Sequence, residues 1–298
     1  MLPFAYATRN LFRDPHRMLQ TVYGSALVVL MVMAATAINQ GMRGVLGASG
    51  SARNVMLVGA GSEESVLRSE IGERAAGIAE ASIAGLAEVT GVRAVSPEVH
   101  QMTFVTDATG QRSQALVRGV TPRALLAHPE VTLLEGRFPE PGEVMVGRLG
   151  WKRLGLPPEQ MQVGGELVIE DVPMRISGLF AAPRTVMESE VWLNLNDLRT
   201  LSQRENLSCV VMRLDTAAYA DVDLFTKQRL DLELSAIRES DYYANLATFY
   251  RPLRGMTWIT AMLMATGALL GGLNTLYAAF ASRIREIGTL QAIGFSRG

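Results

Sequence analysis

The sequence predicts a membrane protein of α+β class: two transmembrane helices flanking a two-lobed extracytoplasmic α+β domain with a β-rich inserted lobe. Hydrophobic residues make up 48% of the chain and charged residues only 19%, which is unusual for a soluble protein. The apolar excess falls in two blocks, at residues 18–38 and 256–281. Between the blocks, short β-type runs alternate with helical stretches, a pattern typical of an α+β domain.

Residues 1–18 are predicted to form a short helix in the inner membrane interface. Phe4, Leu11 and Phe12 fall near one helical face, and Arg9 lies elsewhere, as in helices that rest on a bilayer. A basic flank that only sets membrane topology fits the same residues, so both interpretations stay open.

The first transmembrane helix is predicted at residues 19–40. Residues 21–38 carry no charge, and a helix needs about 20 apolar residues to cross the hydrocarbon core. A cleaved signal peptide is the alternative, because basic residues precede the run and Ala-Thr-Ala at residues 35–37 resembles a cleavage site. The run is longer than the apolar part of most signal peptides, which favours a transmembrane helix.

The second transmembrane helix is predicted at residues 256–281 and carries a candidate helix-packing face. Gly267 and Gly271 are spaced so that two helix backbones could approach closely, and Asn274 follows one turn later. An amide in hydrocarbon needs a hydrogen-bond partner, so this face is expected to look into a helix bundle. Glycines are also common in membrane helices without any packing role.

Basic residues flank both blocks on their outer sides and predict the topology. They are Arg9, Arg13 and Arg17 before the first block, and Arg283, Arg285 and Arg297 after the second. By the positive-inside rule, both termini are cytoplasmic. The central domain, residues 41–255, is then extracytoplasmic. With one cysteine, Cys209, it must be held together by core packing without internal disulfides.

The domain is predicted to begin with a β-α-β-β order and to contain an inserted β-rich lobe at residues 121–205. The first part has a strand at 53–61, an Ala-rich helix at 75–91, and strands at 92–106 and 113–122. After the inserted lobe, the chain returns with a strand at 207–215, a helix at 220–234 and a strand at 235–241. Cys209 lies in the first of these returning strands, where a buried packing role is expected.

No catalytic, cofactor or metal motif stands out, so we expect no enzyme activity from this chain. It has no P-loop, nucleophile elbow, H-E-x-x-H or C-x-x-C pattern, and its net charge of −1 offers no basic field for nucleic acid. His16, His100 and His128 are scattered without metal-ligand spacing. Four clustered carboxylates are interpreted as solvated surface groups: Glu63, Glu64, Glu188 and Glu190.

Residues 282–298 form a short amphipathic segment after the second helix. Ile284, Ile287, Leu290 and Ile293 share one face of a helical projection, and charged residues flank that face. A lipid surface would also accept such a stripe. Glu286 and the two glycines of the segment suit lipid poorly, so a groove on a partner protein is the favoured site of docking.

The C-terminal sequence GGLNTLYAAFASRIREIGTLQAIGFSRG resembles the second-helix exit of the MacB/FtsX-like ABC transporter permeases. That exit has a glycine-rich helix with an Asn, then R-x-R-E-I-G and A-x-G-x-S-R, which residues 271–298 reproduce. Weaker similarity to the family's periplasmic core domain runs through VSPEV, VRGVTP, LLEGRF, GEVMVGRLGWKRLGL and MRISGLF. The opening YATRNLFRDPHRML is similar to the family's lead into its first helix.

The resemblance implies the permease subunit of an ABC transporter in a bacterial cytoplasmic (inner) membrane. It implies a cytoplasmic ATP-binding subunit as partner, and a homodimer or a second permease subunit. Membrane lipid and a periplasmic adaptor protein are further partners, and neither nucleic acid nor a cofactor is expected. Members of the family export amphiphiles, extract lipoproteins or control cell-wall enzymes. By resemblance, the ATPase-coupling residues are Arg283, Arg285, Glu286, Ile287, Gly288, Leu290, Ile293, Gly294 and Phe295.

One departure from the family pattern is expected to matter. Family members continue with two more membrane helices, whereas this sequence stops at Gly298, which predicts a fragment, a split subunit or a shortened permease. Two other classes stay open: a two-span membrane sensor or regulatory protein with an extracytoplasmic ligand-binding domain, and a secreted or anchored interaction module with a cleaved leader.

Overall fold

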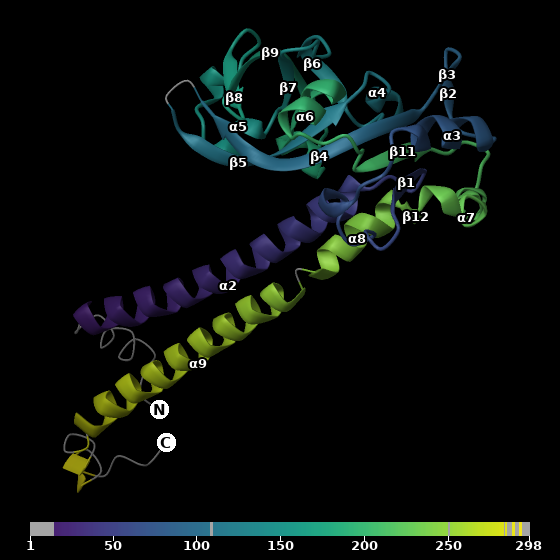
Figure 1. The fold of residues 1–298 in the computed structure, drawn as a ribbon. Helices are drawn as coiled ribbons and strands as arrows, with labels where there is room; N and C mark the ends of the chain where they lie inside the picture. The colour runs from purple at the N-terminus through teal and green to yellow at the C-terminus, as the bar shows by residue number, and fades with distance from the viewer. Residues whose placement is uncertain are drawn as a thin grey trace. The chain divides into compact units, whose positions relative to one another are not determined.

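The computed structural model describes residues 15–107, 110–249, 251–282, 284, 288–289 and 292–293. Its chain divides into two units (Figure 1). The first consists of Met1–Met42 and Tyr250–Gly298, and the second of Arg43–Phe249. Each unit is described by itself below.

The first unit contains two long apolar helices, most of α2 (Pro15–Ser49) and α9 (Arg251–Ser282). Two stretches of described helix are long and apolar enough to cross a membrane, Val22–Ser49 and Gly255–Asn274. Most of their large apolar side chains are exposed in the structure, so these surfaces need an apolar environment or a partner to cover them. Helix α2 continues as helix to Ser49, beyond the end of the span predicted at residues 19–40.

At one end of the second unit is a four-stranded antiparallel sheet (Figure 1). Its strands, in spatial order, are β12 (Leu234–Arg238), β1 (Asn54–Gly59), β11 (Cys209–Arg213) and the first part of β4 (Val95–Thr106). The helices of this part are α3 (Arg74–Ser82), α7 (Tyr219–Gln228) and α8 (Glu239–Phe249). Strand β1 is buried along its whole length, because apolar side chains pack on both faces of this sheet.

The other end of the unit is a closed ring of paired strands. Strands β4, β5, β10, β7, β9 and β8 pair in that order, and β8 pairs again with β4. The remaining bounds are β5 (Arg112–Val120), β6 (Thr132–Gly136), β7 (Glu143–Gly147), β8 (Glu166–Ile169), β9 (Val172–Ala181) and β10 (Val191–Asn194). Strand β6 adds to β9 outside the ring. Closure leaves few unpaired strand edges, which removes sites for edge-to-edge aggregation.

Strand β4 joins the sheet to the ring. Its residues 95–98 pair with β11, and its residues 99–106 pair with β5. The ring therefore includes two strands, β4 and β5, that precede the lobe predicted at residues 121–205. One continuous apolar core runs from the four-stranded sheet into the ring, so both lobes share a single core.

Successive side chains along the ring strands belong in turn to two apolar clusters, an inner one and an outer one. In β7, Val144 and Val146 belong to the core that fills the ring. Met145, between them, packs with Phe180 and Trp192 in a second cluster. This is the period of two expected of a strand whose two faces are both covered.

Three predicted segments differ from the structure near their ends. The helix predicted at 75–91 ends at Ser82, because Gly85 adopts a φ of 77° and Leu86 bridges Leu214 in a β pairing. A hairpin of β2 (Glu88–Val89) and β3 (Val92–Arg93) follows, so tertiary pairing overrides the helix preference of alanine.

The helix predicted at 220–234 ends at Gln228. Residues 239–241, predicted as part of a strand, begin α8. The short elements of the unit are α4 (Ala124–Ala127), α5 (Gly150–Leu154) and α6 (Leu195–Leu201), with 3₁₀ turns η1 (Val66–Arg68), η2 (Pro158–Gln160), η3 (Val186–Ser189) and η4 (Leu230–Leu232).

Two glycines with the same backbone conformation provide a test of close packing beside the ring. Gly136 and Gly142 have φ values of 76° and 83°. A Cβ at Gly136 would overlap the Ser177 carbonyl oxygen, whereas a Cβ at Gly142 would meet no atom within 4 Å. Gly142→Ala should cost about 1–2 kcal/mol for the left-handed conformation alone. Gly136→Ala should cost about 1–3 kcal/mol more, because the clash forces a backbone shift.

Denaturant unfolding of the full chain in detergent, followed by tryptophan fluorescence, measures both losses. Equal losses for the two variants would contradict the close approach of β6 and β9 at Gly136.

Candidate functional site: a buried charge network

Glu98 is the centre of a network of buried charged side chains. It is fully buried at the point where β4 changes its neighbour from β11 to β5. Glu98 Oε2 accepts hydrogen bonds from Arg118 Nη1 at 2.8 Å and from His100 Nε2 at 2.9 Å. Its Oε1 accepts from His128 Nε2 at 2.9 Å. Burial opposes ionisation, but Arg118 and His128 outweigh it and hold the pKa of Glu98 well below its usual value.

Arg118 binds a second buried carboxylate from the neighbouring strand. Its Nε and Nη2 donate to Glu190 at 2.8 and 2.9 Å, a bidentate arrangement. Trp192 Nε1 donates to the same carboxylate at 2.8 Å, and the guanidinium carbon lies 5.4 Å from the Trp192 ring centroid. Against the opposing effect of burial, Arg118 lowers the pKa of Glu190. The guanidinium is thus enclosed by two anions and an aromatic face.

His100 and Cys209 lie beside Arg118 in a fully buried part of the network. Burial and the nearby Arg118 charge both lower the pKa of His100, so its imidazole is neutral at pH 7. Cys209 Sγ lies 3.9 Å from His100 Nε2. Burial, followed by the Glu98 charge, raises the pKa of the thiol well above its usual value. A protonated, buried thiol is a packing group and a poor nucleophile.

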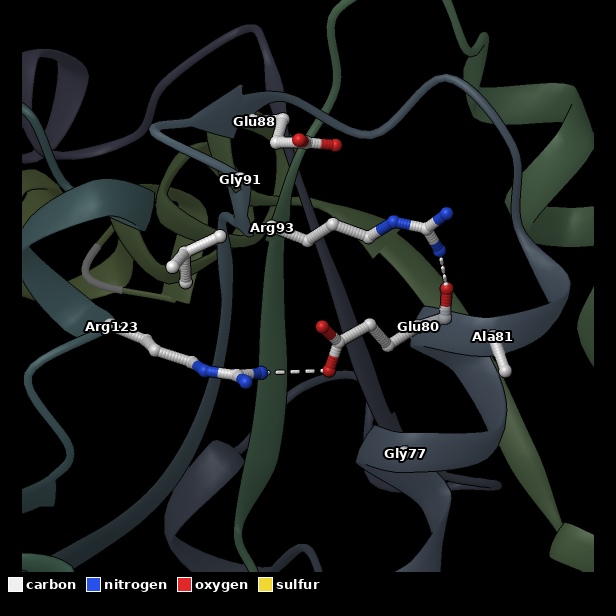
Figure 2. Close-up of a pocket in the computed structure, with 8 residues that line it drawn as sticks. Gly77, Glu80, Ala81, Glu88, Gly91, Arg93 and Arg123 are labelled. Atoms are coloured by element: carbon white, nitrogen blue, oxygen red, sulfur yellow. Dashed lines mark hydrogen bonds and ion pairs between the residues drawn. The ribbon is translucent and has the colours of Figure 1, made fainter.

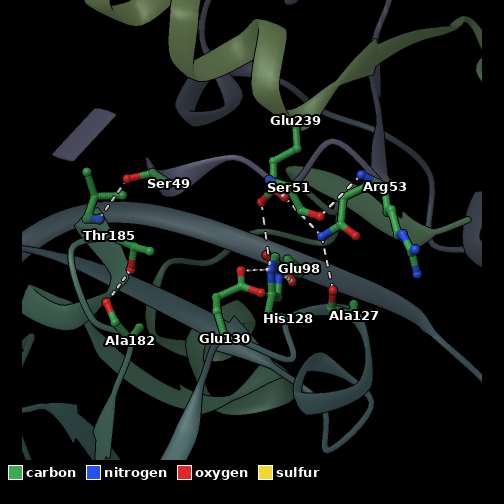
Figure 3. Close-up of polar contacts among 12 residues, drawn as sticks. Ser49, Ser51, Arg53, Glu98, Ala127, His128, Glu130, Ala182, Thr185 and Glu239 are labelled. Atoms are coloured by element: carbon green, nitrogen blue, oxygen red, sulfur yellow. Dashed lines mark hydrogen bonds and ion pairs between the residues drawn. The ribbon is translucent and has the colours of Figure 1, made fainter. Parts of the chain in front are cut away.

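His128 connects the network to Glu130 and Glu239 (Figure 3). Its Nδ1 lies 3.5 Å from Glu130 Oε1 and 3.7 Å from Glu239 Oε1. Burial alone would lower the pKa of His128, but Glu98, with Glu130 and Glu239, raises it to about 10. Three carboxylates therefore attract positive charge to one fully buried imidazole.

Glu239 also closes what we call the junction clamp, formed by residues 49–54 and 239–240. Glu239 Oε2 accepts a hydrogen bond from Ser51 N at 3.0 Å (Figure 3). It accepts another from Asn54 Nδ2 at 2.9 Å. A Cβ at Gly50 would lie 2.6 Å from Ser240 Cα, so only glycine allows this backbone contact. The clamp thus joins the segment that follows α2 to the first residues of α8.

Further hydrogen bonds connect the junction clamp to the rest of the domain. Asn54 Nδ2 also donates to the Ala127 carbonyl at 3.0 Å, one residue before His128. Ser49 Oγ accepts from Val186 N at 2.9 Å, near the ring strand β10. Hydrogen bonds therefore lead from the end of α2 and the start of α8 to the centre of the sheet.

A pocket lies between α3 and the β2–β3 hairpin (Figure 2). Arg123 Nη1 donates to Glu80 Oε2 at 2.7 Å, and Arg93 Nη1 donates to the Glu80 carbonyl. The pocket is lined by two glutamates and two arginines, so its charges balance and leave little net attraction for a ligand.

The predicted ATPase-coupling residues lie mainly outside the described residues. Those outside are Arg283, Arg285, Glu286, Ile287, Leu290, Gly294 and Phe295. Among the described ones, Gly288 is helical and exposed, and Ile293 is in a turn and exposed. Their docking role stays a prediction. Residues 1–14 of the predicted N-terminal interfacial helix are also outside the described residues.

The predicted helix-packing residues of α9 are exposed in the structure. Gly267, Gly271 and Asn274 all lie on accessible helix surface. A Cβ at either glycine would meet no atom within 4 Å of the described chain. Their packing role stays a prediction.

The buried network was missed by the sequence interpretation. His100 and His128 are 28 positions apart, yet both bind Glu98. The surface interpretation of Glu188 and Glu190 is wrong, because Glu188 is buried against Arg148 and Glu190 against Arg118. One signal was present. Glu98 and His100 alternate with apolar residues in a strand, so both side chains lie on the same face of that strand. This pattern indicates a pair of polar side chains on a face that can be buried.

Comparison with known families identifies the class of this domain. The sequence matches the family described as MacB-like periplasmic core domain over residues 18–223. This match begins in the apolar helix α2 and covers most of the mixed α+β unit. The chain therefore belongs to the MacB-like periplasmic core domain family, and the resemblance to MacB/FtsX-like permeases is confirmed. The domain is extracytoplasmic and is preceded by an N-terminal apolar helix.

Two solved structures illustrate what parts of this chain are similar to. The periplasmic region of MacB from Actinobacillus actinomycetemcomitans has 9% sequence identity and a TM-score of 0.49, and the match covers 65% of this chain and 91% of that one. The extracellular domain of the noncanonic ABC-type transporter YknZ from Gram-positive bacteria has 10% identity and a TM-score of 0.47, over 62% and 99%. No curated protein matches this chain significantly.

Removal of Arg118 should destabilise the domain far more than removal of an exposed arginine. Arg118→Met leaves Glu98 and Glu190 buried without their cation, which should cost about 3–5 kcal/mol. Arg229→Met is the matched control, because its partner Asp231 is exposed and such pairs contribute about 0–1 kcal/mol. Denaturant unfolding of the two variants compares these losses. Similar losses would show that the buried network contributes little to stability.

Proposed function

We propose that this chain is the permease subunit of a MacB/FtsX-like ABC transporter. In this proposal a separate cytoplasmic ATPase hydrolyses ATP, and the chain itself has no enzyme activity. The observation that carries the proposal is the family match over residues 18–223, which joins an apolar helix to the domain. A second apolar helix, α9, follows the domain. In this proposal the domain lies outside the membrane, and both chain termini lie in the cytoplasm.

The junction clamp supplies a physical route for coupling. The hydrogen bonds from Ser51 and Asn54 to Glu239 hold the two ends of the domain together. In the proposed mechanism, ATP favours a closed ATPase dimer, and residues 282–298 transmit that preference to the helices. A force that separates or rotates the helices then reaches the domain at the clamp. His128 and Glu98 lead from there to the sheet.

The proposed work of the domain is export or extraction of an amphiphile or a lipoprotein. Because movement is transmitted to an extracytoplasmic domain, no substrate has to pass between the helices. Such a machine acts as a homodimer or with a second permease subunit, and a periplasmic adaptor is a further proposed partner.

An affinity pull-down of the tagged chain from its native membranes in mild detergent tests the ATPase partnership. Mass spectrometry should identify a Walker-motif ATPase that co-purifies with the intact chain. The ATPase should be absent when residues 283–298 are deleted. Glu286→Arg should also weaken recovery, because the change reverses a charge beside the apolar stripe. Absence of any ATPase, or equal recovery with and without the tail, would contradict docking through this segment.

The coupling role of the clamp is tested by Gly50→Val. The larger side chain must push residues 49–51 away from Ser240, so the ends of the domain should separate while the core stays folded. In the complex with its ATPase, we expect ATP to change the limited proteolysis pattern of the wild-type domain. In the Gly50→Val variant, we expect ATP to leave the pattern unchanged.

Gly47→Ala is the control for Gly50→Val, because a Cβ at Gly47 would meet no atom of the described residues within 4 Å. This variant should keep the wild-type response to ATP. An unchanged response in Gly50→Val would remove the clamp from the mechanism and leave the ATPase partnership standing.

A further inference from the structure

The environment of His128 has the features of a metal site. Its side chain is fully buried, and its Nδ1 is a buried atom without a hydrogen-bond partner in the described chain. Glu130 Oε1 and Glu239 Oε1 face that nitrogen at 3.5 and 3.7 Å. The three atoms lie within 4.8 Å of one another. These separations are too long for good N–H···O hydrogen bonds.

The two separations from Nδ1 are close to those between ligands that share one ion. With metal–ligand bonds of about 2.0–2.2 Å, neighbouring ligand atoms of a tetrahedral site lie about 3.3–3.5 Å apart. We propose that His128 Nδ1, Glu130 and Glu239 bind a divalent first-row transition ion such as Zn²⁺, with water as a fourth ligand. A site of one imidazole and two carboxylates favours zinc over magnesium or calcium, which prefer oxygen ligands throughout.

The groups behind the ligands are those expected around a bound metal. The other imidazole nitrogen of His128 donates to Glu98 at 2.9 Å, an arrangement that fixes the ring and increases the basicity of the ligating nitrogen. Glu239 keeps its second oxygen on Ser51 and Asn54, which leaves the first oxygen for the ion. Both ligands are thus oriented before any metal binds.

Charge and access also fit. The carboxylates around His128 also attract a divalent cation, and metal binding would release the Nδ1 proton. The Glu130 side chain is 27% exposed, whereas His128 and Glu239 are buried. Glu130 therefore lies on the solvent side of the site, where an ion can enter and a water ligand can be held.

A second group of possible ligands is excluded by its surroundings. Glu98, His100 and Cys209 also approach one another, but Arg118 Nη1 already occupies the same Glu98 oxygen at 2.8 Å. A guanidinium at that position repels a metal cation. Cys209 is held as a thiol by burial, and thiols bind metal only after losing the proton.

A bound ion would join two parts of the chain that meet at the clamp. Glu239 begins α8, whereas His128 and Glu130 both lie in the segment between α4 and β6. Zinc would thus brace the junction between the domain and its following helix. This inference is separate from the proposed transport function, because equilibrium binding needs neither an ATPase nor a substrate.

The test uses the full chain in detergent, purified without a histidine tag and stripped with EDTA. Elemental analysis after gel filtration with Zn²⁺ should find one ion per chain, and competition with a zinc-sensitive dye should give its Kd. Glu130→Gln should raise that Kd at least about tenfold by removing a ligand. Glu135→Gln is the control, since this exposed carboxylate on β6 makes the same charge change outside the site.

Two further readouts identify the ligands and guard against misfolding. Co²⁺ in place of zinc should give visible bands of a tetrahedral nitrogen–oxygen site without sulfur-to-cobalt charge transfer. Zinc should raise the unfolding temperature of the wild type and of Glu135→Gln. It should raise the unfolding temperature of Glu130→Gln by a smaller amount. Glu130 is partly exposed, so its variant should fold where His128→Ala fails.

Three results would overturn the assignment. They are less than stoichiometric zinc on the wild-type chain, equal weakening by Glu130→Gln and Glu135→Gln, or a thiolate band in the cobalt spectrum.

Discussion

The ion pair between Glu98 and Arg118 is the interaction on which the rest of the domain depends. Strand β4 passes from one lobe to the other at Glu98, so the side chain there is buried by both. An ionised carboxylate at such a position costs several kcal/mol unless it is fully paired. Arg118 supplies the charge, and His100 and His128 complete the hydrogen bonds. Because Arg118 comes from β5 and His128 follows α4, pairing Glu98 fixes the positions of both elements.

The network has a consequence for the ends of the domain. His128 faces Glu239, and Glu239 accepts from Ser51 and Asn54. The pairing of the buried charges at the centre of the sheet therefore depends on the geometry of the junction clamp. A network of directional polar contacts has few alternative arrangements, whereas an apolar contact tolerates sliding. Such a connection suits a domain whose proposed role is to respond to movements of the helices that precede and follow it.

Two groups of residues belong to the proposed function in different ways. The clamp and its network lie within the described residues and explain how force could enter the domain. The tail from Arg283 to Phe295 lies largely outside the described residues, and its docking role is supported by resemblance to the permease family. The inferred ion site lies at the clamp, where a metal would add a second link between Glu239 and the residues around His128.

The sequence by itself determined the apolar helices, the α+β class, most strands and the family, because these depend on local periodicity and on motifs contiguous in the chain. The run of apolar residues at 21–38 and the strand at 54–59 are examples. Tertiary structure decided the closed ring, the sharing of β4 between the lobes and the early end of α3 at Ser82. It also decided the polar network. Glu98, Arg118 and His128 meet only when elements distant in the chain pack together, and their spacing along the chain does not predict that contact.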